Sequence, residues 1–346
     1  MQVSLVDISR AYFHARTDDK NPLFVELPPE DPDYGKGLCG QLNVHMYGTR
    51  PAADGWHSEY SSTMQSMGFT IGVSTACVFR HYGLHLVSSV HGDDFTTAGP
   101  KSALDKFVEE LRTKYELKEA ARLGPAPEDD KEARILNRVV RWTKEGIEYE
   151  ADPRQSEKLV QELGLQGCKG VSTPAVKPNM EQINADTPLD ENKITHFRAL
   201  AARSKYLSAD RPECQFGAKE ICRFMSQPTM LSTEALKRMG RYLAKHPRLI
   251  YKYPIQTSID GLDIYADTDH AGCLRTRKST RGGCVLAGKH LLKSWSSTQP
   301  TITLSSGEAE LHGVVRAGAA GLGFLSLFAD LGVQLPLRVW TDSTAS

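Results

Sequence analysis

The chain carries no net charge, because its 42 lysines and arginines are matched by 42 aspartates and glutamates. A neutral chain has no overall field that draws it toward nucleic acid, so any such binding must rely on local patches. One candidate patch holds the cations Arg275, Arg277, Lys278 and Arg281. The same cluster is also typical of an ordinary solvated loop, and composition alone leaves both interpretations open.

Paired cysteines are absent as well. The seven cysteines are odd in number and none forms a C-x-x-C pair, which argues against a disulfide framework and against a zinc site built from thiolates. No run of 18 apolar residues occurs, and the first ten residues lack the pattern of a signal peptide. We therefore expect a soluble intracellular protein with free thiols and no membrane partner.

Three acids in the last third of the chain stand in the order that a two-metal site requires. Asp267 closes an alternating apolar run, Glu310 lies where a helix is expected to open, and Asp342 ends the β-like run LRVWTD. Two divalent cations about 4 Å apart need bridging carboxylates, and oxygen ligands without thiols favour Mg²⁺ or Mn²⁺. The order strand, helix, strand predicts a ribonuclease H fold, although a single acid at a strand end is more often a solvated cap.

A second set of acids lies in the first hundred residues. Asp7 follows an apolar run, and Asp93 and Asp94 follow the β-like run 84–90. Gly92, directly before this pair, permits the unusual dihedral angles of a hairpin turn. A Gly-Asp-Asp triplet is by itself commonly just a turn. Here it follows a D-x-x-x-A-Y pattern that begins at Asp7, which makes a joint site more plausible.

Three ordered blocks surround the acids of the last third. They read ADTDHAG at 266–272, RKSTRG at 277–282 and SWSSTQPTITLSSGEAE at 294–310. Together they resemble the ribonuclease H domain of copia-type retrotransposon polyproteins. The resemblance implies that Asp267, Glu310 and Asp342 are catalytic and hold metal. It favours Glu310 over Glu308, because in related folds the acid directly precedes an apolar helix residue, here Leu311.

The front and the middle of the chain carry further blocks. The front has VDISRAYFHA at 6–15, MYGTRPAADGW at 46–56 and VHGDDFTTAG at 90–99. The middle has GVSTPA at 170–175, THFRALAARSKYLSADRPEC at 195–214, RFMSQPT at 223–229 and LKRMGRYL at 236–243. These are similar to the same polyproteins, and the front blocks look like the polymerase motifs of a reverse transcriptase. The resemblance therefore covers nearly the whole chain.

The resemblance implies an α+β fold in three parts. A reverse transcriptase palm would occupy 1–125. A thumb and helical connection would occupy 126–258, with a linker near 171–194. A partial ribonuclease H-like α/β domain would occupy 259–346.

Two helices of this fold are predicted from apolar periodicity. One spans 102–118, opens with a capping box at Ser102 and Asp105, and buries a set of apolar residues. That set is Leu104, Phe107, Val108, Leu111 and Tyr115. The other spans 307–331 and would bury Leu311, Val314, Val315, Leu322, Leu325 and Phe328.

The chemistry implied by the resemblance is two-metal phosphoryl transfer. Asp7, Asp93 and Asp94 would be catalytic, with Asp7 and Asp93 holding Mg²⁺ or Mn²⁺ for DNA synthesis on RNA or DNA templates. The C-terminal acids would hydrolyse RNA in RNA–DNA hybrids. The implied partners are RNA, DNA, RNA–DNA hybrid and deoxynucleoside triphosphates, in a cytoplasmic retrotransposon particle or in the nucleus.

Contacts to nucleotide or template are expected from residues near the first acids. Tyr12 and Phe13 stand where the family places a residue beneath the incoming sugar, although both could equally be core aromatics. Arg50 and Trp56 are further candidates for contact to template or nucleotide. For Trp56, however, we favour a place in the core.

Departures from the family pattern weaken the expectation of activity. At 51–54 the chain has PAAD where the family has Gln-Ala-Pro-Arg, which removes a polar and a basic side chain and introduces Asp54. The chain starts six residues before Asp7 and stops soon after Asp342, so we expect both sites to be incomplete and primer extension to be undetectable. The alternative is a catalytically inactive or co-opted remnant that at most binds nucleic acid. The surrounding blocks disfavour an unrelated two-metal phosphatase or nuclease.

Overall fold

The computed structural model of the chain describes residues 1–344. The backbone forms two compact units. The first comprises Met1–Lys131 with Ser326–Val333, and the second comprises Glu132–Leu325 with the residues from Gln334 onward. Each unit has its own sheets and its own buried core.

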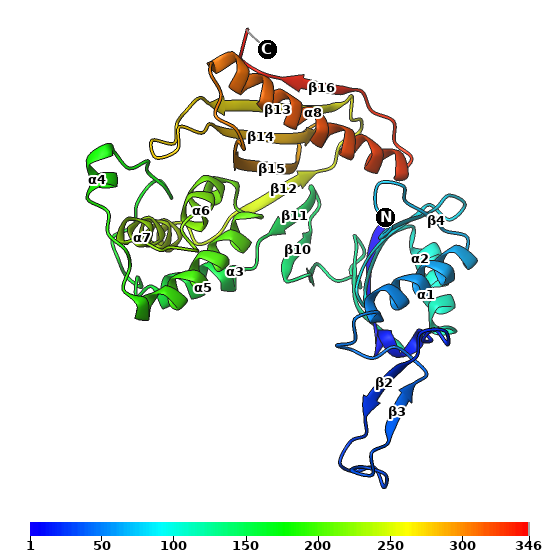
Figure 1. Cartoon of the computed structure of the whole chain (residues 1–346). Helices are drawn as coiled ribbons and strands as arrows, with labels where there is room; N and C mark the ends of the chain where they lie inside the picture. Colours follow the sequence, from blue (N-terminus) through cyan, green and yellow to red (C-terminus); the bar gives the residue numbers. More distant parts are fainter. Residues whose placement is uncertain (345–346) are drawn as a thin grey trace. The chain divides into compact units, whose positions relative to one another are not determined.

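The first unit is built on a six-stranded antiparallel sheet with the order β4-β5-β6-β7-β1-β8 (Figure 1). Its strands are β1 Gln2–Ile8, β4 Thr70–Ile71, β5 Val78–His81, β6 Leu86–His91, β7 Asp94–Gly99 and β8 Leu117–Leu123. β1 pairs with a neighbour on each side, so the chain's first strand is held inside the sheet.

Two helices share one core with this sheet, α1 (Ala52–Ser66) and α2 (Lys101–Arg112). Trp56 of α1 and Phe107 of α2 are both only 1% exposed and pack with strand residues such as Val6. Burial of such large apolar side chains is worth about 1.5–3 kcal/mol each and fixes the helices on the sheet. The prediction that Trp56 lies in the core is confirmed.

The prediction for α2 is right about the buried face and wrong about the ends. All five residues predicted to face the core are buried. The helix ends at Arg112, and Pro100 is its N-cap residue, with no hydrogen bond from a side chain. Ser102 therefore lies inside the first turn, where it cannot serve as the N-cap of a capping box. Tyr115 lies beyond the helix, and its hydroxyl donates to Thr63 Oγ1 at 2.7 Å.

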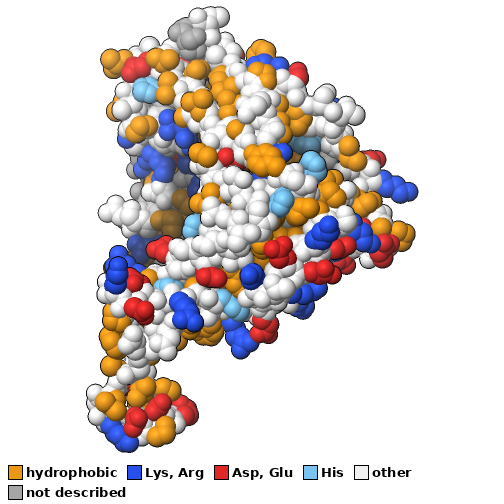
Figure 2. Space-filling view, turned by 90° about the vertical axis from the view of Figure 1, so that its right-hand side faces the viewer, with side chains coloured by type: hydrophobic (Ala, Val, Ile, Leu, Met, Phe, Trp, Pro, Cys, Tyr) orange, Lys and Arg blue, Asp and Glu red, His pale blue; other side chains and the backbone are white. Residues whose placement is uncertain are grey.

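A two-stranded hairpin projects from the first unit (Figure 1). It consists of β2 (Leu23–Glu26) and β3 (Cys39–Leu42) and follows the short 3-10 helix η1 (Ala11–His14). Its tip carries Glu30, Asp31 and Asp33, and Figure 2 shows acidic side chains gathered there. Because β2 and β3 pair only with each other, this hairpin adds nothing to the six-stranded sheet.

The second unit begins with a sheet of the order β12-β11-β10-β9 and a helical cluster. The strands are β9 Glu132–Ile135, β10 Arg138–Trp142, β11 Gly146–Glu150 and β12 Ile250–Pro254. The helices are α3 Pro153–Glu162, α4 Met180–Asn184, α5 Glu191–Ser208, η2 Pro212–Cys214, α6 Gln215–Cys222 and α7 Met230–Lys245. α3, α5, α6 and α7 share one core, which includes Leu159, Phe197, Ile221 and Met239.

The second unit continues into a mixed sheet of the order β15-β14-β13-β16. Its strands are β13 Leu262–Asp269, β14 Thr280–Ala287, β15 His290–Thr298 and β16 Leu337–Trp340. β13 pairs antiparallel with β14 and parallel with β16. The long helix α8 (Ser306–Asp330) connects β15 to β16, as a parallel crossover requires.

α8 contacts this sheet through its small residues. The buried positions recur every four residues, at Ala309, Gly313, Ala317 and Gly321. An added Cβ on Gly321 would lie 2.5 Å from Ile264 Cδ1 and 2.6 Å from Leu337 Cδ1, so the helix axis runs close to the sheet. Larger side chains have no room on this face.

The predicted buried face of this helix is therefore wrong. Leu311, Val315 and Leu322 are 52%, 62% and 64% exposed. The other three residues predicted to be buried are only partly buried, namely Val314, Leu325 and Phe328. A helix rich in large apolar residues is expected to bury them, but the close approach to the sheet turns them outward. α8 is also long and apolar enough to cross a membrane, with a mean hydropathy of 1.4. One such helix is weak evidence for a membrane-spanning segment.

Two glycines of α8 provide a test of this packing. We expect Gly321→Leu to lower the free energy of unfolding by about 1–3 kcal/mol, because the new side chain collides with Ile264 and Leu337. Gly323→Leu, where a Cβ would meet nothing within 4 Å, should instead raise it by up to about 1 kcal/mol through helix propensity. Urea denaturation of both variants measures the difference. Equal effects of the two substitutions would contradict the close approach.

Candidate metal sites

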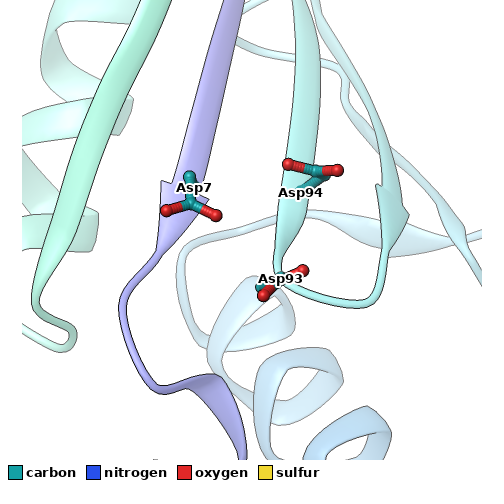
Figure 3. A group of neighbouring side chains, drawn as sticks. All are labelled: Asp7, Asp93 and Asp94. Atoms are coloured by element: carbon teal, nitrogen blue, oxygen red, sulfur yellow. The ribbon is translucent and has the colours of Figure 1, made fainter. Parts of the chain in front are cut away.

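The first acidic cluster lies where β1 and β7 run side by side (Figure 3). Asp7 of β1 is paired in register with Asp94 of β7, and Asp93 lies in the turn just before β7. One carboxylate oxygen from each of the three lies within 4.8 Å of the others. The structure thus brings together three acids that the sequence separates into positions 7 and 93–94.

The turn that presents Asp93 depends on Gly92. His91 pairs with Asp94, so Gly92 and Asp93 are the two turn residues, and Gly92 has a φ of +64°. A positive φ at the first turn residue suits a two-residue hairpin turn and favours glycine. The Asp93 carbonyl accepts from the Ile8 amide at 3.0 Å, which ties the turn to the end of β1.

The three carboxylates repel one another. Burial, and then the charges of Asp93 and Asp7, raise the pKa of Asp94, while His91 acts in the opposite direction. No ion pair of the described residues involves Asp7, Asp93 or Asp94. A bound divalent cation would relieve this repulsion, and the three oxygen donors are of the type that Mg²⁺ and Mn²⁺ prefer.

Two aromatic residues of the block at 46–56 border this cluster. The Trp56 Nε1–H donates to the Gly92 carbonyl at 2.8 Å and so holds the turn from the core side. Burial, and then the charge of Asp93, raise the pKa of Tyr47. Sequence reasoning missed Tyr47, and its position in a motif block was the only available signal.

Two of the predicted contact residues, Tyr12 and Phe13, lie beside Tyr47. The rings of Tyr12 and Tyr47 have centroids 4.4 Å apart, and Phe13 meets Tyr47 edge-on at 5.8 Å. Tyr12 packs partly against the core, Phe13 is exposed, and Arg50 is exposed after the turn that follows Tyr47. A contact of any of these residues to nucleotide or template stays a prediction.

The hydrogen bond from Trp56 offers a test of how the turn is held. In an Asp267→Asn background that leaves only the first cluster, we expect Trp56→Phe to weaken Mn²⁺ binding by roughly tenfold, the scale of lost supporting contacts around a metal site. Titration followed by electron paramagnetic resonance measures this. The matched control is Trp142→Phe on β10, which should leave the affinity unchanged. Equal affinities of the two variants would show that this hydrogen bond does not position Asp93 and Asp94.

The second acidic cluster lies in the second unit, beside the parallel pair β13 and β16. Tyr265 pairs with Trp340, and Asp267 and Asp342 each follow their paired residue by two positions. Glu310 extends from the first part of α8, and one carboxylate oxygen from each acid lies within 4.8 Å of the others. The structure therefore brings Asp267, Glu310 and Asp342 together.

Glu310 carries the clearest sign of a missing partner in this cluster. Its Oε2 is buried and has no hydrogen-bond partner among the described residues. Burial, and then the charges of Asp267 and Asp342, raise the pKa of Glu310. An unpartnered buried carboxylate oxygen is costly, so a divalent cation fits this donor set.

Two nearby acids, Glu308 and Asp269, make contacts outside this cluster. Glu308 Oε2 accepts from the Leu304 amide at 2.7 Å, next to the start of α8. Asp269 forms an ion pair with Lys177 and is absent from the cluster of described acids. Glu308 therefore acts locally at the helix start, and Glu310 is the glutamate that reaches the other two acids.

A buried polar network supports the second cluster and was missed from the sequence. Gln299, only 1% exposed, donates from Nε2 to the Ala309 carbonyl at 2.8 Å, one residue before Glu310. Ser279 Oγ accepts from the Ala271 amide and lies 3.1 Å from Thr303 Oγ1. These contacts join the three motif blocks to one another, which accounts for the polar residues inside them.

Comparison with known proteins places the chain among retroelement proteins. No family model matches it. The chain is 26% identical to the retrovirus-related Pol polyprotein from transposon RE2 of Arabidopsis thaliana, over 99% of this chain and 23% of that protein. It is 23% identical to the corresponding polyprotein from transposon TNT 1-94 of Nicotiana tabacum, over 100% of this chain and 26% of that protein. The chain thus spans about a quarter of the length of these relatives.

A solved structure supports the fold. The foamy viral protease-reverse transcriptase in complex with dsDNA matches 99% of this chain and 60% of its own, with a TM-score of 0.56 and 11% identity. At this identity the likeness concerns the fold alone. The expected mixed α+β fold of a reverse transcriptase followed by a ribonuclease H-like part is confirmed.

Proposed function

Since this chain is a homologue of the retrovirus-related Pol polyproteins of copia-type transposons, we propose that it carries two metal-dependent phosphoryl-transfer sites. In this proposal the chain corresponds to the reverse transcriptase and ribonuclease H-like region of such a polyprotein. In our proposal Asp7, Asp93 and Asp94 serve DNA synthesis. Asp267, Glu310 and Asp342 serve hydrolysis of RNA in RNA–DNA hybrids.

One observation carries this proposal. In each cluster, three acids from segments far apart in the sequence present oxygens within 4.8 Å of one another, although Asp93 and Asp94 are neighbours in the chain. Ions about 4 Å apart, as two-metal phosphoryl transfer uses, need shared carboxylates at this spacing. In the second cluster the unpartnered Oε2 of Glu310 adds an acceptor that a metal would satisfy.

The residues of the second cluster would divide the work of holding Mg²⁺ or Mn²⁺. Asp267 lies on β13 and Asp342 lies two residues beyond the end of β16, so both would hold the ions from this edge of the sheet, and Glu310 would hold them from α8. Such ions, when bound, polarise a phosphodiester and lower the pKa of bound water. The sheet and the Gln299 contact keep the three acids in place, which is the positioning that this chemistry requires.

The first cluster would hold its ions in the same manner. Asp7 and Asp93 would be the metal ligands, with Asp94 beside them. Tyr12, Phe13 and Arg50 would contact the deoxynucleoside triphosphate or the template, and Tyr47 borders the site from the same side. RNA, DNA and their hybrid are the proposed partners, in a cytoplasmic retrotransposon particle or the nucleus.

A hydrolysis assay tests the proposal. The chain is incubated with an RNA–DNA hybrid labelled on the RNA strand, with Mg²⁺, with Mn²⁺, or with a chelator. We expect cleavage of the RNA strand only in the hybrid and only with a metal. Cleavage of single-stranded RNA at the same rate, or cleavage in the chelator, would show that the second cluster does not perform the proposed reaction.

A specific observation favours a second candidate for the first cluster, namely a site that binds metal and nucleic acid without catalysis. Pro51 is the N-cap residue of α1, and Asp54 lies exposed in its first turn. An acid there replaces the basic group of the family pattern and would repel a triphosphate if its side chain faces the pocket. Primer extension on poly(rA)/oligo(dT) separates the candidates, with an Asp93→Asn, Asp94→Asn control. Extension that the double substitution abolishes would establish catalysis, and its absence would favour the binding role.

A further inference from the structure

A cavity of about 530 Å³ lies in the second unit, lined by none of the six clustered acids. Its walls come from the segment after α3, from α4, α6 and α7, and from the loop that follows β13 (Figure 1). Much of its surface is apolar, with Pro174, Ile183, Phe216, Ile221, Phe224 and Leu231 among the lining residues. Pockets of this size and character commonly bind small molecules.

The charged residues of the wall are mostly cationic. Six cationic side chains line the cavity, and the acids in its lining are Glu220 and Glu234. Three of the cations already have acidic partners. These ion pairs are Lys177 with Asp269, Arg223 with Glu220, and Arg275 with Asp186.

The other three cations are Lys237, Arg238 and Arg241, and all belong to α7. None of them forms an ion pair with an acid among residues 1–344. Arg238 donates to Thr173 Oγ1 at 2.8 Å, yet its Nε is buried and has no hydrogen-bond partner in that range. Arg241 donates to the Lys169 carbonyl at 2.9 Å. This side of the cavity therefore has donors and positive charge to offer an anion.

The aromatic rings of the wall argue against a stacked base. The Lys219 Nζ lies 4.8 Å from the centre of the Phe216 ring, and the Arg275 Cζ lies 5.3 Å from that of Phe224. Both rings already hold a cation over one face. The remaining apolar wall suits a flexible aliphatic or small aromatic body better than a nucleobase sandwiched between rings.

We propose that this cavity binds an amphipathic organic anion, an apolar body with one carboxylate or sulfonate group. The apolar wall covers the body, and Arg238 and Arg241 of α7 bind the charged group. This site is independent of the two acidic clusters and of the activities proposed for them.

Binding is tested on the full chain with two probes. Fluorescence of 1-anilinonaphthalene-8-sulfonate reports occupancy, and decanoate competes for the same cavity. We expect saturable binding of one probe molecule per chain and its displacement by decanoate. Decanol, which has the same tail without the charge, should displace the probe at least tenfold less effectively.

Variants locate the site. Arg238→Gln with Arg241→Gln should weaken binding at least tenfold, and Ala175→Trp, which fills the cavity from the linker, should abolish it. The matched control is Lys158→Gln with Lys205→Gln, which removes two charges from helices α3 and α5 outside the cavity and should leave binding unchanged. Thermal unfolding of each variant shows whether it folds. The comparison of decanoate with decanol uses the unmodified chain, so it tests the proposal even if a variant fails to fold.

Several results would overturn the proposal. Binding that both double variants reduce equally would indicate general electrostatic attraction. Displacement by inorganic phosphate as effective as that by decanoate would indicate a simple anion site. Displacement of the probe by an RNA–DNA hybrid but not by decanoate would assign the α7 cations to a nucleic-acid surface.

Discussion

Replacing Asp267 with asparagine is expected to slow hydrolysis of the RNA strand in a hybrid by roughly 100-fold or more. Asparagine keeps the size of the side chain but removes a charge and an oxygen ligand from a cluster whose three acids lie within 4.8 Å of one another. Metal ions contribute several kcal/mol of transition-state stabilisation, and each 1.4 kcal/mol corresponds to about tenfold in rate. The single-turnover rate with saturating Mg²⁺ measures the loss.

The matched control for this substitution is Asp269→Asn. Asp269 lies two residues further along β13 and pairs with Lys177 outside the cluster. Losing this half-exposed ion pair should change the rate by less than about fivefold, equivalent to 1 kcal/mol. A second readout, Mn²⁺ affinity by calorimetry, should fall for Asp267→Asn and not for Asp269→Asn. Equal behaviour of the two variants in both assays would remove Asp267 from the site.

Replacing Glu150 with alanine is expected to lower the free energy of unfolding by about 3 kcal/mol, the low end for breaking a buried ion pair. Glu150 ends β11, and its side chain is only 3% exposed. Arg248 and Arg141 each donate to its Oε2 at 2.8 Å. The hydrogen bonds from Arg248, and then the one from Arg141, hold the pKa of Glu150 below its usual value despite burial.

The ion pairs of Glu150 also predict that the free energy of unfolding depends on pH. A carboxyl group whose pKa is lower in the folded state stabilises the fold at pH values above its unfolded pKa, about 4.3. This contribution is lost as the pH falls through the folded pKa. The difference between the wild type and Glu150→Ala should therefore be full at pH 7 and shrink below about pH 4.

Urea denaturation at several pH values measures both effects. Glu148→Ala is the matched control, because Glu148 lies on the same strand and its ion pair with Lys252 spans 3.9 Å. That long pair, in which the Lys252 side chain is exposed, should contribute less than about 1 kcal/mol. Equal losses for the two variants at pH 7, or a difference that persists at pH 3, would contradict the assigned role of Glu150.

Local patterns in the sequence determined the element types and the candidate acids. Periodicity identified the buried face of α2, since residues three and four positions apart share one side of a helix. The hairpin turn at Gly92 was predictable because this glycine lies after a β-like run and directly before two acids. The choice of Glu310 over Glu308 came from the resemblance alone, and the cluster in the structure contains Glu310.

Only the tertiary structure decided which residues meet. The register of β13 against β16 brings Asp342 close to Asp267. The two strands are 75 residues apart, so no local sequence pattern predicts that they pair. Trp56 reaches the Gly92 carbonyl, and Tyr47 meets the rings of Tyr12 and Phe13, only because the segment at 46–56 folds back against the first part of the chain. The outward-facing Leu311 and Leu322 of α8 were mispredicted for a related reason. The hydrophobicity of a side chain indicates whether it favours burial, but the distance between helix and sheet decides which side chains fit between them. In α8 the buried positions are occupied by glycine and alanine.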